Sequence, residues 1–146
     1  MRVIATDPYL PEDNENWNVA QKVALDELLA TADVMSIHCP LTPDTRGMIG
    51  AQQLARMKKG AVLINSARGG IVDEPACAEA LRSGHLGGAA LDVFDYEPIK
   101  PDAGKVFAGL SNVILTPHIS GVTLEANHRV SFMTVNSVAR VLKKGR

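Results

Sequence analysis

Membrane-length hydrophobic runs and cysteines at a paired spacing are both missing from this 146-residue sequence. The longest apolar runs are far shorter than the ~18 residues that a membrane-spanning helix needs, so a membrane protein is not expected. The two cysteines, Cys39 and Cys77, match no metal-binding or redox spacing, which makes a reducing, cytoplasmic compartment the expectation. Residues 1–6 are too short, and too soon followed by Asp7, to act as a secretory signal.

The sequence also lacks an excess of either charge. Its 15 Lys and Arg residues nearly balance 16 Asp and Glu residues, and the net charge of −1 comes without a basic stripe. A nucleic acid or an anionic membrane surface is therefore not an expected partner. Aromatic residues are few at 4%, but hydrophobic residues reach 46%, and this length suffices for one domain with its own core.

Short apolar runs alternate with helical patterns along the whole chain. Strands are predicted over residues 2–6, 21–24, 33–38, 61–65, 88–94 and 112–115. Helices are predicted over 25–30, 50–58, 73–83 and from 123 to the C-terminus, with loops over 8–18 and 97–104. Asp73 is predicted to be the N-cap of the third of these helices. The alternation predicts an α/β fold built on a parallel, doubly wound sheet.

Three polar residues, Arg68, Glu97 and His118, each follow one of these apolar runs closely. Parallel strands end at one edge of their sheet, and open α/β sheets bind ligands at that edge. The guanidinium of Arg68 can bind a carboxylate through two hydrogen bonds, and His118 can transfer a proton near neutral pH. A carboxylate such as Glu97, bonded to imidazole, fixes the tautomer and favours the imidazolium. The three residues together outline a catalytic site.

Taken one at a time, the same residues also fit structural roles. Arg68 could be a surface arginine beside the flexible Gly69-Gly70 turn, His118 a structural histidine after a strand, and Glu97 a solvated acid in a loop. Their equivalent positions after three strands favour the catalytic interpretation.

Asp7 ends the first predicted strand and has two interpretations. In dinucleotide-binding folds, an acid after the second strand accepts hydrogen bonds from the adenosine ribose and repels a 2′-phosphate. An Asp-Pro pair such as Asp7-Pro8 is equally typical of an ordinary turn.

No metal site is expected from the histidines and cysteines. His38 and Cys39 are adjacent, but no second pair completes a ligand set. His85 and His128 have no partner at a metal-binding spacing.

Four further segments occur in fixed order: residues 37–45 (IHCPLTPDT), 57–74 (MKKGAVLINSARGGIVDE), 91–98 (LDVFDYEP) and 115–121 (LTPHISG). Together they make the sequence similar to the D-isomer-specific 2-hydroxyacid dehydrogenases. The resemblance runs from Val3 to about Val141. It implies a Rossmann-type fold and an NAD-dependent oxidoreductase that moves a hydride between NAD(H) and C2 of a 2-hydroxy or 2-keto acid.

The resemblance also implies a role for each site residue. Arg68 would bind the substrate carboxylate, His118 would exchange a proton with the C2 oxygen, and Glu97 would hold His118 in place. Asp7 would bind the adenosine ribose and favour NAD over NADP, and Asp92 would hold the nicotinamide carboxamide. The other residues implied at the cofactor are Cys39, Pro40, Thr45 and Ala67, together with His118.

One departure from the family pattern is large. A glycine-rich G-x-G-x-x-G turn should precede Asp7 by about 20 residues, yet Met1 lies only six positions before it. Residues 1–146 are therefore expected to form a partial dinucleotide-binding domain without its substrate domain. In a sheet ordered 3-2-1-4-5-6, the strand that is not found is the central one, so the isolated chain is expected to be a poor dehydrogenase.

Alternatives to a dehydrogenase remain open at this point. The chain could be a non-catalytic NAD-binding sensor, since transcriptional corepressors share this fold, or an inactive fragment that needs a partner chain. For the enzyme, a homodimer of the full-length form is expected. The substrate side chain stays undetermined among glycerate-type, phosphoglycerate-type and sulfolactate-type acids.

Overall fold

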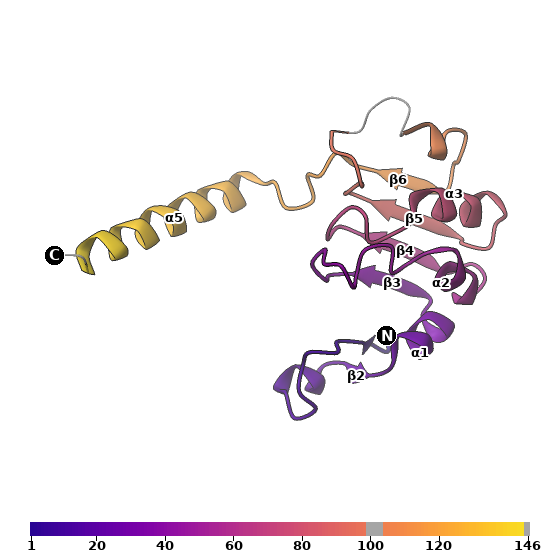
Figure 1. The fold of residues 1–146 in the computed structure, drawn as a ribbon, viewed down its shortest axis with the longest axis horizontal. Coiled ribbons are helices and arrows are strands. Elements are labelled where there is room, and N and C mark those ends of the chain that lie inside the picture. The colour runs from indigo at the N-terminus through magenta and orange to yellow at the C-terminus, as the bar shows by residue number, and fades with distance from the viewer. Residues whose placement is uncertain (99–103, 145–146) are drawn as a thin grey trace.

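A four-stranded parallel sheet forms the centre of the computed structural model, which describes residues 1–98 and 104–144. Its strands lie in the order β3-β4-β5-β6, so each is paired with the next in the chain (Figure 1). The strands are β3 (Val34–Ile37), β4 (Val62–Asn65), β5 (Gly88–Leu91) and β6 (Val113–Leu115). The predicted parallel α/β architecture is confirmed.

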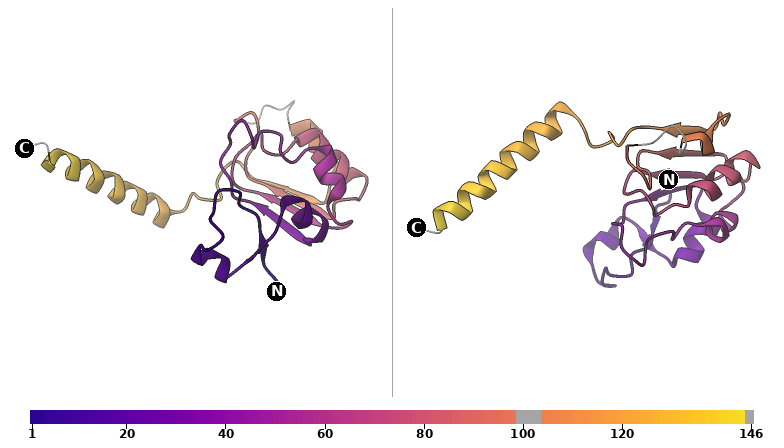
Figure 2. Two further views of the ribbon diagram at one scale, coloured as in Figure 1. Left: turned by 60° about the horizontal axis from the view of Figure 1, so that its bottom comes forward. Right: turned by 45° about the horizontal axis from the view of Figure 1, so that its top comes forward.

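Three helices lie side by side on one face of this sheet (Figure 2). They are α1 (Leu25–Thr31), α2 (Ala51–Arg56) and α3 (Glu74–Arg82), and α3 begins, as predicted, after an Asp73 side chain that accepts a hydrogen bond from Ala76 N–H. Alternate strand residues are buried beneath these helices, as the two-residue period of a strand requires: Met35, Ile37, Leu63, Asn65, Ala89 and Leu91. Within the described residues the opposite face of the sheet carries no helix, and Val34 and Ile114 are exposed there.

The N-terminal segment forms a second, smaller sheet. Strand β1 (Ile4–Ala5) pairs in parallel with β2 (Gln21–Lys22), and a 3-10 helix, η1 (Glu15–Asn18), lies inside the predicted loop 8–18. Both strands are shorter than predicted because they pair only with each other and bury few side chains. No strand in the described part of the chain links β1 to β3, so the two sheets are separate (Figure 1).

The segment after β5 differs from the prediction. The strand ends at Leu91 rather than at Phe94, because Phe94 N–H donates to the Glu97 carboxylate and leaves the ladder. A second 3-10 helix, η2 (Lys105–Phe107), follows where no element was predicted. Most of the predicted loop 97–104 lies outside the described residues.

Helix α5 (Leu124–Lys144) confirms the predicted C-terminal helix and extends away from the sheets (Figures 1 and 2). Its apolar side chains are exposed, including Leu124, Val130, Phe132, Met133, Val135, Val138, Val141 and Leu142. None of the described helices is both long enough and apolar enough to cross a membrane.

Candidate active site

The carboxyl ends of the four central strands form one row. Ile37, Asn65, Leu91 and Leu115 are partners across successive strand pairs. The loops that follow these residues therefore leave the sheet at the same edge. Arg68, Glu97 and His118 come three, six and three residues after β4, β5 and β6, which brings all three predicted residues to this edge.

The turn that carries Arg68 is shaped by Asn65, the buried last residue of β4. Its Oδ1 accepts from Ala67 N–H at 3.1 Å, and its Nδ2 donates to Arg68 O at 3.0 Å. A Cβ at Gly69 would lie 1.8 Å from Phe94 O, so only glycine fits between this turn and the next loop. The Arg68 guanidinium donates to Ala67 O at 2.6 Å and is exposed.

His118 and Glu97 form a hydrogen-bonded pair. His118 Nδ1 lies 2.7 Å from Glu97 Oε2, and Glu97 Oε1 accepts from Phe94 N–H at 2.9 Å. The hydrogen bond with His118, and then the one from Phe94, lower the pKa of Glu97 below its usual value. His118 adopts φ = 55°, a left-handed conformation that is rare for a residue other than glycine. With Nδ1 engaged by Glu97, Nε2 is the nitrogen left for a ligand.

Asp92 supports the loop that carries His118. Its side chain is buried and accepts from Thr116 Oγ1 at 2.5 Å, Ile119 N–H at 2.9 Å and Ser120 N–H at 2.9 Å, on both sides of His118. Burial alone would raise the pKa of Asp92, but the hydrogen bonds from Ser120, Thr116 and Ile119 outweigh it and hold the pKa well below its usual range. Asp92 is therefore ionised and fixes this loop.

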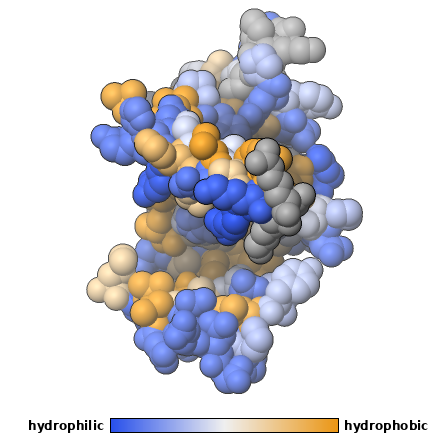
Figure 3. All heavy atoms as spheres, turned by 90° about the vertical axis from the view of Figure 1, so that its left-hand side faces the viewer, coloured by the Kyte–Doolittle hydropathy of each residue, from blue (hydrophilic) through white to orange (hydrophobic). Residues whose placement is uncertain are grey.

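Two hollows adjoin these side chains. The larger, of about 570 Å³, is lined by Ser66, Arg68, His118, Ser120, Gly121 and Val122. The smaller, of about 240 Å³, reaches from Arg68, Glu97 and His118 toward Leu41 and Arg46 of the loop after β3. A guanidinium and an imidazole thus face the same space, which suits a small acid. Figure 3 shows the molecule from the side on which α5 projects, and polar and apolar side chains are mixed on this face.

The residues predicted at the cofactor differ in their place and in how they are held. Asp7 follows β1 of the smaller sheet, and its Oδ1 accepts from Tyr9 N–H at 2.8 Å and Leu10 N–H at 3.2 Å, which closes the local turn. Thr45 Oγ1 donates to Pro40 O at 2.7 Å and so stabilises the loop after β3. Cys39 and Ala67 are half-buried against the core, whereas Pro40 is exposed.

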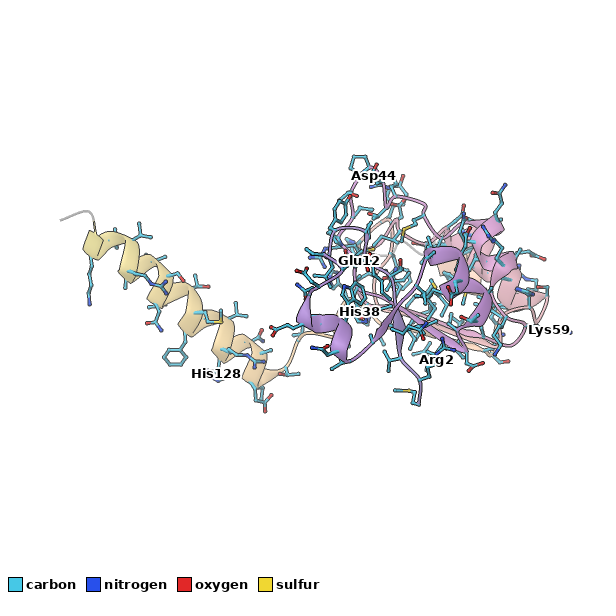
Figure 4. All side chains as sticks on the ribbon, turned by 90° about the horizontal axis from the view of Figure 1, so that it is seen from below. Arg2, Glu12, His38, Asp44, Lys59 and His128 are labelled. Carbon is cyan, nitrogen blue, oxygen red and sulfur yellow. The ribbon has the colours of Figure 1, made fainter. Side chains whose placement is uncertain are left out.

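The histidines do not gather in one place. His38 lies at the sheets, whereas His128 lies on the projecting helix α5 (Figure 4). Among the described residues, no three His, Cys, Asp or Glu side chains are grouped so that they could hold a metal ion.

Several residues that shape the site were missed by the sequence analysis. Asn65 and Thr116 hold the turns that carry Arg68 and His118, and Glu74 accepts from Asp95 N–H in the loop that carries Glu97. Only Asn65 carried a usable signal, because it is a polar residue at the end of an otherwise apolar strand.

Comparisons with known proteins identify the family. The model of the D-isomer specific 2-hydroxyacid dehydrogenase NAD binding domain matches residues 1–120. The chain is 50% identical over 143 residues to the (S)-sulfolactate dehydrogenase of Chromohalobacter salexigens, covering 97% of this chain and 46% of that protein. It is 40% identical to the D-3-phosphoglycerate dehydrogenase of Archaeoglobus fulgidus, covering 98% of this chain and 27% of that protein.

Solved structures point the same way. The D-lactate dehydrogenase of Aquifex aeolicus, determined in complex with NAD and lactic acid, superposes with a TM-score of 0.85 at 34% identity, covering 99% of this chain and 47% of that one. The chain thus spans about half the length, or less, of these relatives. The fold and NAD as the cofactor of this domain are confirmed. Because the family model matches most of its residues, the chain belongs to the D-isomer-specific 2-hydroxyacid dehydrogenases.

Proposed function

We propose that this chain supplies the acid/base and carboxylate-binding residues of an NAD-dependent dehydrogenase of 2-hydroxy acids. The observation that carries the proposal is the 2.7 Å hydrogen bond between His118 and Glu97 beside Arg68, with His118 and Arg68 lining one hollow. An exposed guanidinium next to an imidazole recognises a carboxylate with an adjacent oxygen. That pattern is the one found in 2-hydroxy and 2-keto acids.

Each residue has a defined part in the proposed reaction. Arg68 binds the substrate carboxylate and polarises the C2 oxygen next to it. His118 Nε2 gives a proton to that oxygen in reduction and removes it in oxidation. Glu97 keeps the imidazole in its tautomer and balances the positive charge of the imidazolium. Bound NAD supplies the hydride chemistry, which these side chains cannot perform.

The residues present fit one end of NAD better than the other. Asp92 accepts hydrogen bonds from Thr116, Ile119 and Ser120 of the loop that carries His118, and it is proposed to hold the nicotinamide carboxamide at this end. Cys39, Pro40, Thr45 and Ala67 are proposed to border the cofactor on this side, and Asp7 to meet the ribose. No G-x-G-x-x-G turn for the pyrophosphate occurs in the 146 residues.

We further propose that the chain works as part of a longer, cytoplasmic enzyme that forms a homodimer. Its 46% coverage of the sulfolactate dehydrogenase supports a partial NAD-binding domain joined to a substrate domain. Both cysteines are free, which fits a reducing compartment. The exposed apolar side chains of α5 provide surface for contacts with further protein.

Two measurements test this function. The complete enzyme that contains this chain should oxidise NADH with a small 2-keto acid, and the absence of turnover with glyoxylate, hydroxypyruvate, pyruvate and 3-sulfopyruvate would overturn the proposal. The isolated 146-residue chain should bind NAD poorly in calorimetry, because it lacks the pyrophosphate turn. Micromolar affinity of the isolated chain for NAD would contradict the proposal that these residues form only part of the NAD-binding domain.

A further inference from the structure

The loop that presents Glu97 is held at Asp95 from two sides. Glu74, in the first turn of α3, accepts from Asp95 N–H at 2.7 Å. Arg46, in the loop between β3 and α2, pairs with Asp95 Oδ1 at 3.0 Å. These contacts join three segments that are distant in the sequence, and neither contact belongs to the pair formed by His118 and Glu97.

Glu74 sits in surroundings that disfavour a carboxylate. It is half-buried, and burial raises the pKa of Glu74 above its usual value, although the hydrogen bond from Asp95 N–H acts in the opposite direction. The negative charges of Asp95, Asp73 and Glu97 raise the pKa further. The hydrogen bond from Asp95 N–H is the interaction in the structure that favours the carboxylate at this unfavourable position.

That bond acts one peptide away from the Glu97 contacts. Phe94 N–H donates to Glu97 Oε1, and Asp95 N–H, the next amide, donates to Glu74. The loop therefore directs two successive N–H groups to two different carboxylates. If Asp95 N–H loses its acceptor, the Phe94–Glu97 turn is held less firmly, and the hydrogen bonds of Glu97 with Phe94 and His118 weaken.

We propose that Glu74 is a positioning residue of the acid/base site: by accepting from Asp95 N–H, it holds the turn that places Glu97 against His118. The inference rests on the proposed function only for its catalytic consequence. Arg46 supports the same turn through the Asp95 side chain. Glu74 itself contacts no substrate in this role.

Two conservative variants separate the geometry from the charge. Glu74→Gln keeps an acceptor oxygen at the same reach but removes the charge, whereas Glu74→Asp keeps the charge but draws the oxygen back from Asp95. Both residues are tolerated in the first turn of a helix. Glu79→Gln is the matched control, because Glu79 lies exposed on the same helix and pairs with Arg82.

The first readout is the titration of the Glu97 carboxyl carbon by NMR in the 146-residue chain, assigned with Glu97→Gln. In Glu74→Asp we expect the pKa of Glu97 to rise by about half a unit to one unit, because its hydrogen bonds weaken. In Glu74→Gln it should stay or fall slightly, since a nearby negative charge is removed. The proposal is overturned if the pKa of Glu97 rises in Glu74→Gln but not in Glu74→Asp, or if it changes in neither variant.

The second readout is turnover of the complete enzyme. Glu74→Asp should lower kcat by about tenfold with KM within about twofold, and Glu74→Gln should keep most of the activity. The NMR titration needs no catalysis. Failure of the proposed function can therefore be distinguished from failure of the positioning role of Glu74. If Glu97 responds as expected in a protein without turnover, the proposed function is wrong and the positioning role stands. If turnover is normal in Glu74→Asp and Glu97 does not respond, the positioning role is wrong.

Discussion

The two sheets of this chain differ in how firmly they fix the candidate site residues at their edges. The four-stranded sheet β3–β6 has a buried core, and its strand ends bring Arg68, Glu97 and His118 together through internal hydrogen bonds. The two-stranded sheet β1–β2 has strands of two residues each, and among the described residues Asp7 after β1 is bonded only to its own turn.

The difference separates two parts of one proposed function. In the proposed function, acid/base chemistry and carboxylate binding depend on contacts made within β3–β6 and its loops. Binding of the adenosine half of NAD is proposed to depend on β1–β2, whose edge strand β1 has no partner toward β3 in the described residues. Substitutions in the larger sheet should therefore act on chemistry and folding, and those in the smaller sheet on cofactor choice.

The largest effect is expected from His118→Asn in the complete enzyme. Asparagine tolerates the left-handed backbone at this position but cannot transfer the proton. We expect kcat to fall by about 10²- to 10⁴-fold, measured as NADH oxidation at saturating 2-keto acid. His128→Asn, on the projecting helix α5, is the control and should keep wild-type turnover. A His118→Asn enzyme with more than a tenth of that turnover would remove His118 from the chemistry.

Substitutions in the buried central sheet should destabilise the chain more than substitutions in the exposed two-stranded sheet. Leu63 in β4 is fully buried, and Leu63→Ala should reduce the free energy of unfolding by about 2–5 kcal/mol. Val3, beside β1, is 46% exposed, and Val3→Ala should change the free energy of unfolding by less than about 0.5 kcal/mol. Urea unfolding of the 146-residue chain, followed by circular dichroism, measures both. Equal losses would show that β1–β2 is as tightly packed as the central sheet.

Local signals in the sequence predict most of the central sheet. Apolar runs and the Asp73 cap located every strand of the central sheet and the helices beside it, because these patterns repeat within a few residues. The shared edge then followed from the parallel order of the strands, which placed Arg68, Glu97 and His118 together. For β1 and β2 the same patterns predicted strands that were too long, because the length of a strand also depends on its neighbours.

What the sequence could not show are contacts between distant segments. Glu74 and Asp95 are 21 residues apart, and Asp92 binds a loop more than 20 residues further on. The resemblance assigned Asp92 to the cofactor, whereas in the structure three of its hydrogen bonds go to the loop of His118. No periodicity or spacing encodes such bonds, because they depend on how the loops leave the sheet.

The pH dependence of stability should reveal the buried charge of the central sheet. The pKa of Asp92 is lower in the folded chain than in the unfolded one, so its contribution is present above about pH 4. As the pH falls below that value, the unfolded state takes up the proton first, and stability is lost, by about 1–2 kcal/mol at pH 2–3. Asp92→Asn should flatten this part of the profile in urea titrations, whereas Asp44→Asn, at an exposed loop, should not. An unchanged profile in Asp92→Asn would contradict the role of its charge.

The smallest effect is expected from Asp7→Asn, and it distinguishes the two interpretations of the smaller sheet. If the carboxylate meets the ribose, its removal should improve the use of NADP relative to NAD by about fivefold to tenfold in kcat/KM, because repulsion of the 2′-phosphate is lost. If Asp7 only closes its turn, Asn can accept the same bonds from Tyr9 and Leu10, and the ratio should stay constant. Asp13→Asn, in the same exposed segment, controls for a general loss of negative charge. A changed ratio in Asp7→Asn alone would show that cofactor choice is governed by β1, apart from the sheet that carries the chemistry.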